Sequence, residues 1–123
     1  MVKEKENPNV KNGHPDECAE WILPVRDALD VLYGRWKLPI IISLTFGDKR
    51  FTQIRDEIPG LTDKSLSKEL KELEGNQLIT RTVFDTFPPR VMYSITAHGR
   101  SLEKVINELR DWGNQHRKKI INF

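Results

Sequence analysis

The stretch that decides the fold is Leu61–Leu78, LTDKSLSKELKELEGNQL. When it is placed on a helix at about 100° per residue, its leucines gather on one face and its lysines on the opposite face. The leucine face holds Leu66, Leu70 and Leu73, the other face holds Lys64, Ser67, Lys68 and Lys71, and glutamates occupy the flanks. Such a helix can pack on a core and present cations to a phosphate backbone, although an ordinary solvated face has the same pattern.

A shorter helix is expected just before this one. The segment Phe51–Ile58 has apolar residues at helical spacing, and a Pro-Gly pair follows it. Thr62 is a suitable N-cap residue for the helix that comes next. Two short helices joined by a tight glycine-containing turn indicate a helix-turn-helix, whose second helix, about 63–75, would enter the major groove.

A β-hairpin is predicted after the helix pair. Two runs, 78–84 and 91–96, are rich in β-branched and aromatic residues and flank a loop with two prolines. Helix, turn, helix and hairpin is the order of a winged helix-turn-helix. The hairpin tip, about 84–91, would then lie on the DNA backbone or in the minor groove, with Arg90 near it. The prolines are explained equally well as protection of an exposed strand edge.

Two further helices are expected before the helix-turn-helix. Pro24 predicts the start of the first helix, which would run to Gly34. The second, Trp36–Phe46, is apolar enough to be buried. It accommodates Pro39 in its first turn, where the backbone N–H groups have no intrahelical partner.

A long helix is predicted at the C-terminus, from a Thr96 cap to about Lys119. A small core with a wing cannot easily cover its apolar stripe. The stripe and the segment after Pro24 are therefore expected to join two subunits, although packing within one chain would also explain it. The residues expected at this dimer interface are Val25, Leu29, Leu102, Val105, Ile106, Leu109 and Trp112. The predicted fold class is mainly α with a small β-hairpin (α+β), a winged helix-turn-helix with N- and C-terminal dimerisation helices.

The predicted DNA-binding surface combines the lysine face with cations on either side of it. Its residues are Arg50, Thr62, Lys64, Ser65, Ser67, Lys68, Lys71 and Arg90. Lysines would contact phosphates, serines would reach base edges or phosphates, and Arg50 and Arg90 would clamp the backbone on either side. Arg55 would contribute or pair with a neighbouring acid. The predicted recognition helix has no arginine or asparagine in its first two turns for bidentate contacts to bases. Sequence selectivity is therefore expected to depend more on the wing and on DNA shape.

Six short motifs, in order, carry a resemblance to a known family. They are Tyr33–Trp36 (YGRW), Gly47–Phe51 (GDKRF), Ile58–Gly60 (IPG), Leu66–Glu74 (LSKELKELE), Pro88–Tyr93 (PPRVMY) and Leu109–Gly113 (LRDWG). Together they resemble the HxlR-type winged-helix transcriptional regulators, relatives of the MarR class. The resemblance implies a prokaryotic homodimeric regulator that binds operator DNA.

The chain departs from that family at the position of a sensing thiol. Family members often carry a Cys-Pro pair ahead of the first core helix, and here the matching pair is Leu23-Pro24. The only cysteine is Cys18, which has Glu17 and Glu20 nearby. Carboxylates disfavour the reactive thiolate. Cys18 is therefore the candidate redox residue, and we expect that it is not the main switch.

Composition sets further bounds. A chain of 123 residues fits one winged-helix domain, 16–123, after a polar tail, 1–15. The net charge of +2 is modest for a DNA-binding protein, so the argument for DNA rests on where the cations lie. One cysteine and three scattered histidines give no disulfide framework and no metal spacing, and no catalytic motif stands out. We expect neither an enzyme nor a cofactor, and a cytoplasmic protein without a signal peptide or membrane span.

Two questions stay open from the sequence. A winged-helix module that binds proteins without touching DNA would have the same core, and the near-neutral charge favours it. A small-molecule effector could also bind near Trp36, Phe84 and Tyr93, although aromatic residues at such spacing commonly fill the core.

Overall fold

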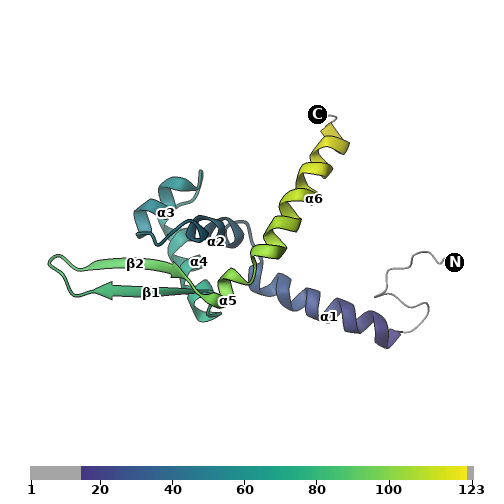
Figure 1. The fold of residues 1–123 in the computed structure, drawn as a ribbon, viewed down its shortest axis with the longest axis horizontal. Helices are drawn as coiled ribbons and strands as arrows, with labels where there is room; N and C mark the ends of the chain where they lie inside the picture. The colour runs from purple at the N-terminus through teal and green to yellow at the C-terminus, as the bar shows by residue number, and fades with distance from the viewer. Residues whose placement is uncertain (1–14, 122–123) are drawn as a thin grey trace. The chain divides into compact units, whose positions relative to one another are not determined.

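The computed structural model describes residues 15–121, which are mainly helical with one small antiparallel sheet (Figure 1). The fold class predicted from the sequence is therefore confirmed. The elements are α1 (Pro15–Leu32), α2 (Lys37–Thr45), α3 (Phe51–Glu57), α4 (Asp63–Gly75), β1 (Ile79–Phe84), β2 (Arg90–Ile95), α5 (Ala97–Arg100) and α6 (Glu103–Ile121). The chain divides after Tyr33 into two units, the first holding α1 and the second the remaining elements. The expected tail, 1–15, lies almost wholly outside the described residues.

Helix α1 begins nine residues earlier than the sequence suggested. Pro24 lies inside the helix and does not open it, which corrects the prediction. Pro15 instead occupies the first helical position, where its missing N–H costs nothing. The side chains from Cys18 to Asp30 are exposed, so water can satisfy the carbonyl that Pro24 leaves without a donor.

The core of the second unit is built around α2. Ile40, Ile41 and Leu44 are fully buried, and Pro39 falls in the first turn of the helix, as predicted. The remaining apolar core residues come from α3, α4 and the elements that follow them, and are Ile54, Leu61, Leu66, Leu70, Leu73, Leu78, Ile79 and Tyr93. Burial of the three leucines of α4 confirms the leucine face read from the sequence.

Helices α3 and α4 form the predicted helix-turn-helix. Gly60 makes the turn between them with a φ of 85°, a conformation that glycine adopts without strain. Thr62 caps α4 because its Oγ1 accepts a hydrogen bond from the Ser65 N–H at 3.1 Å. The helix boundaries 63–75 match the predicted recognition helix.

The hairpin pairs β1 with β2 from Ile79 opposite Ile95 to Phe84 opposite Arg90. A bridge between Lys49 and Tyr93 ties β2 to the segment before α3, with N···O distances of 3.0 and 2.8 Å. Only Ile79 is buried along β1, because the outer part of the hairpin projects beyond the helices as a wing (Figure 1).

The single C-terminal helix predicted from Thr96 is broken into two. Thr96 does cap a helix, but α5 ends at Arg100 and α6 begins at Glu103. A Cβ built on Gly99 would lie 2.3 Å from the Leu78 carbonyl oxygen, so α5 is pressed against the base of the hairpin. Leu102 therefore lies in the break and not on α6.

Candidate nucleic-acid interface

The face of α4 opposite its leucines is exposed, as the sequence predicted. Lys64, Ser67, Lys68 and Lys71 are exposed, and Ser65 is half-buried because it closes the helix cap. Thr62 is exposed but uses its hydroxyl oxygen for that cap. Exposed cations on a helix that follows a tight turn can approach a phosphate backbone.

The three lysines of this face are not equivalent. Lys68 Nζ lies 3.2 Å from a carboxylate oxygen of Glu72, one turn along the helix, and 3.9 Å from Glu69. No ion pair of this kind is seen for Lys64 or Lys71 among the described residues. DNA would therefore compete with carboxylates for Lys68 but not for the other two.

A buried ion pair behind α4 was not anticipated from the sequence. Lys37 on α2 is 2% exposed, and its ammonium donates to Glu69 and, at 2.6 Å, to Glu72. Glu69, one of the glutamates on the flanks of α4, is itself buried, with 7% of its surface exposed. The carboxylate is buried because Lys37 reaches it from a helix 32 residues away in the chain. The pair thereby joins α4 to the core helix.

Charge pairing in this cluster shifts the pKa of Lys37 and of Glu72. Burial opposes the charged form of Lys37, but hydrogen bonds to Glu69 and Glu72 outweigh it and raise the pKa of the ammonium. The hydrogen bond from Lys37, then the one from Lys68, lowers the pKa of Glu72. Both shifts favour the charged forms of Lys37 and Glu72 near neutral pH, which keeps this pair intact.

A hollow of about 430 Å³ lies between α4 and the wing. Its lining residues are Phe51, Ser67, Leu70, Lys71, Glu74, Arg81 and Tyr93. Arg81 on β1 therefore joins Lys71 and Ser67, two predicted contact residues. Arg81 was not among the residues predicted to bind DNA. Its position in the predicted wing strand was a signal for it, but the register that places it opposite Tyr93 cannot be read from the sequence. Two cations beside a hydroxyl suit a phosphate oxygen.

Arg50 and Arg90 lie together at a second place. Both line two neighbouring hollows, of about 330 and 500 Å³, between the start of α3 and the wing. The Arg90 guanidinium lies 4.7 Å from the centre of the Phe84 ring, a cation–π contact that holds it on the wing. The two arginines therefore lie together and not on either side of the lysine face, which differs from the arrangement expected from the sequence.

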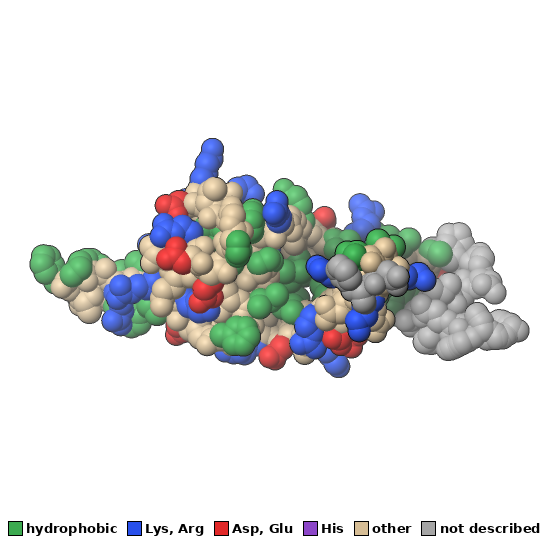
Figure 2. Space-filling model, turned by 90° about the horizontal axis from the view of Figure 1, so that it is seen from above, with side chains coloured by type: hydrophobic (Ala, Val, Ile, Leu, Met, Phe, Trp, Pro, Cys, Tyr) green, Lys and Arg blue, Asp and Glu red, His purple; other side chains and the backbone are tan. Residues whose placement is uncertain are grey.

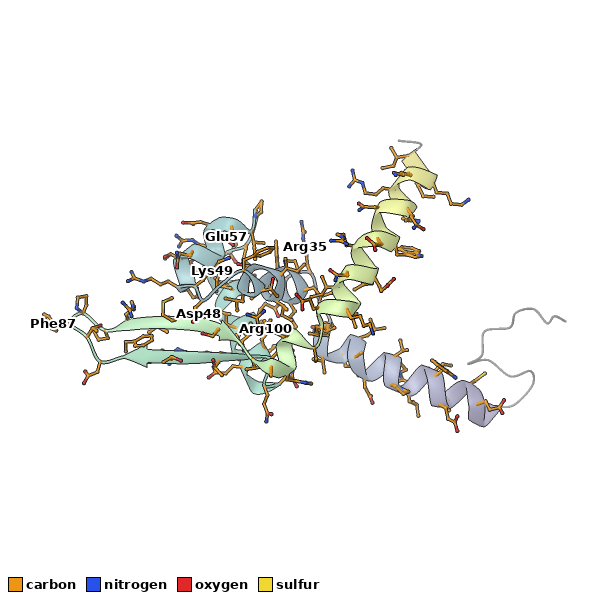
Figure 3. The ribbon with its side chains drawn as sticks, in the orientation of Figure 1. Arg35, Asp48, Lys49, Glu57, Phe87 and Arg100 are labelled. Carbon is orange, nitrogen blue, oxygen red and sulfur yellow. The ribbon has the colours of Figure 1, made fainter. Side chains whose placement is uncertain are left out.

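Arg55 is occupied by acids. Its guanidinium bonds Asp63 at 3.0 Å and Asp56 at 3.2 Å, and hydrogen bonding to Asp63, then to Asp56, raises its pKa. Of the two roles considered for Arg55, the structure shows the pairing. Lys49 is likewise bonded to Glu57 at 2.7 Å, next to Ser43 (Figure 3). The pKa of Glu57 is lowered by that bond and, second, by the Ser43 hydroxyl.

The three aromatic residues considered for an effector lie in different settings. The Trp36 ring is beside Gly60 and under the Arg35 guanidinium, 4.9 Å from its centre. Phe84 is on the wing under Arg90, and Tyr93 is bridged to the segment before α3. Within residues 15–121, three or more acidic, histidine or cysteine side chains do not cluster as metal ligands, and no helix is long and apolar enough to cross a membrane.

Both predicted dimerisation helices expose apolar side chains. On α1, Val25 and Leu29 are exposed, as are Trp21, Ile22, Leu23 and the Cys18 thiol. On α6, Val105, Leu109 and Trp112 are exposed. Ile106 is half-buried and lines a hollow of about 390 Å³ together with Ile42 and Phe46. The Trp112 and His116 rings stack at 4.9 Å along the stripe.

Comparison with known proteins agrees with this geometry. The model of the HxlR-like helix-turn-helix family matches residues 31–120. The chain belongs to this family. It is 40% identical to the HTH-type transcriptional regulator YdeP of Bacillus subtilis over 97 residues, 79% of this chain and 76% of YdeP.

Solved structures of similar proteins have the same fold. A crystal structure of the B. subtilis HTH-type transcriptional regulator YtcD is 39% identical, with a TM-score of 0.72 over 75% of this chain and 94% of that chain. The redox regulator HypR in its reduced form is 35% identical, with a TM-score of 0.75 over 81% of this chain and 99% of HypR. The present chain is thus a transcriptional regulator with a winged helix-turn-helix domain.

Proposed function

We propose that this HxlR-like regulator is a cytoplasmic homodimer that binds operator DNA. In this proposal α4 enters the major groove and the wing lies along the backbone or the minor groove. The observation that carries it is the convergence of Lys71 and Ser67 of α4 with Arg81 of the wing at one hollow. A buried leucine face on the other side of α4 holds these groups in place.

Two clusters of cations would grip the backbone. The cluster around α4 consists of Lys64, Lys71 and Arg81. The cluster around the wing consists of Arg50 and Arg90. Phosphate contacts position a protein on DNA, while base contacts give it selectivity. Because the net charge is only +2, this local arrangement has to supply the attraction.

The dimer rests on apolar surface that the described chain leaves open. Helix α6 has no buried residue, and Leu109 and Trp112 are at least half exposed. A helix with one apolar stripe is stable when that stripe is covered. A second subunit would cover it and would also set the spacing between two recognition helices on the DNA.

The test is binding to DNA as a function of salt. Genomic fragments retained by the purified protein are sequenced, and affinity for a retained duplex and for a mixed-sequence duplex is followed by fluorescence anisotropy. We expect affinity that falls steeply with salt and is higher for the retained duplex. Absence of binding to either duplex at low salt would instead support the protein-interaction module.

A further inference from the structure

We propose that Phe87 at the tip of the wing is a wedge that enters the minor groove and partly unstacks one base step. The proposal rests on the DNA binding proposed above and adds a residue that determines sequence preference. Phe87 is 100% exposed, at the far end of the hairpin (Figure 3). In Figure 2 the apolar atoms at the left end of the molecule belong to this tip. The free energy of binding becomes more favourable when a partner removes such an exposed aromatic ring from water.

The tip holds Phe87 in a defined loop. The Thr86 N–H donates to the Phe84 carbonyl at 2.8 Å, and the Thr86 hydroxyl donates to the Pro88 carbonyl, also at 2.8 Å. Pro88 and Pro89 restrict the backbone further. A side chain presented by a preorganised loop loses little conformational entropy on insertion, so more of the stacking energy remains for binding.

Cations behind the tip favour DNA as the partner. Arg90 is held over the Phe84 ring, and Arg50 lines the same hollow as Phe87. An apolar tip backed by two guanidinium groups matches a base stack bordered by phosphates. Minor-groove proteins combine these parts, with apolar side chains between base steps and cations on the groove walls.

The recognition helix leaves room for such a contribution. The first two turns of α4, DKSLSKEL, carry no arginine, asparagine or glutamine for bidentate contacts to bases. A wedge selects sequence differently, because pyrimidine–purine steps unstack at lower cost than other steps. The wing would therefore prefer a TA or CA step at its own position in the operator.

The experiment compares duplexes selected from a random-sequence pool by the wild type and by Phe87→Ser. We expect the wild-type duplexes to be enriched in a pyrimidine–purine step outside the positions read by α4, and the serine variant to lose that enrichment alone. Affinity of the serine variant for a wild-type duplex should fall about tenfold, as for loss of one stacked aromatic ring. Phe87→Leu should restore most of it, because leucine is also an apolar wedge.

A direct readout uses 2-aminopurine placed at the enriched step, whose fluorescence rises when its neighbour unstacks. The rise should appear with the wild type and Phe87→Leu and be absent with Phe87→Ser. Val83→Ala is the matched control, since Val83 is half exposed on the stem of the same wing, and it should behave as the wild type.

Three results would overturn the wedge. They are unchanged affinity and step preference in Phe87→Ser, an equal loss in Val83→Ala, or a fluorescence rise that survives the serine change. A wild type that retains no duplex at all would overturn the proposed function itself, and the wedge with it.

Discussion

At the scale of single residues, Lys37 shows how one buried charge positions α4. Its ammonium lies between α2 and α4 and bonds two carboxylates of α4. A buried ion pair adds little net stability compared with apolar packing, but removing one partner leaves an uncompensated charge. The pair therefore acts mainly through the position it imposes on α4.

Replacing Lys37 by methionine should lower the free energy of unfolding by about 3 kcal/mol, because Glu69 would keep a buried charge without its main partner. The double variant Lys37→Met/Glu69→Leu should recover most of that loss. Urea unfolding of both variants measures the difference. If the single variant is as stable as the wild type, water or another cation must satisfy Glu69, and the positioning role falls.

At the scale of elements, α4 and the wing line one hollow between them. The cations of α4 therefore differ in whether they are available to bind DNA. Lys71 and Arg81 line the hollow, whereas Lys68 is engaged by Glu72. Periodicity alone put Lys68 and Lys71 on the same face with the same role. The difference comes from the neighbours that the fold supplies.

Lys71→Ala should therefore weaken DNA binding more than Lys68→Ala. Loss of one phosphate contact lowers the slope of log affinity against log salt by about 0.9, and we expect that change for Lys71. Stability should change by no more than about 0.5 kcal/mol in either variant, since both side chains are exposed. Salt titrations of binding to a mixed duplex give both slopes. Equal slopes for the two variants would contradict the assignment.

Two glycines test how the C-terminal helices are placed. A Cβ on Gly99 would meet the Leu78 carbonyl oxygen and the Ile95 side chain, whereas a Cβ on Gly113 meets nothing within 4 Å. Gly99→Ala should lower the free energy of unfolding by about 1–3 kcal/mol through overpacking. Gly113→Ala should raise the free energy of unfolding by about 0.5–1 kcal/mol, because alanine is more favourable than glycine in a helix interior. Thermal unfolding compares them, and a tolerated Gly99→Ala would mean that α5 is not pressed against the hairpin.

At the scale of the whole molecule, the open apolar stripe of α6 makes the oligomeric state the main question. A charge placed in a covered stripe would be buried without a partner. Leu109→Glu should give monomers or insoluble protein, while Asn114→Glu, on the opposite side of the helix at about 100° per residue, should leave the assembly unchanged. Light scattering at micromolar concentration reads the mass. A wild-type mass of one chain would refute the dimer.

The sequence by itself determined the order of elements, the Thr62 cap, the buried leucines of α4 and the family. These features depend on helical period, caps and turn residues, which act over a few positions. The tertiary structure decided the rest. Lys37 meets Glu69 across 32 residues, Arg81 lines the same hollow as Lys71 only because the wing folds back beside α4, and Gly99 lets α5 approach the Leu78 carbonyl oxygen. Such contacts join distant parts of the chain, so their free energies leave no local pattern from which to predict them.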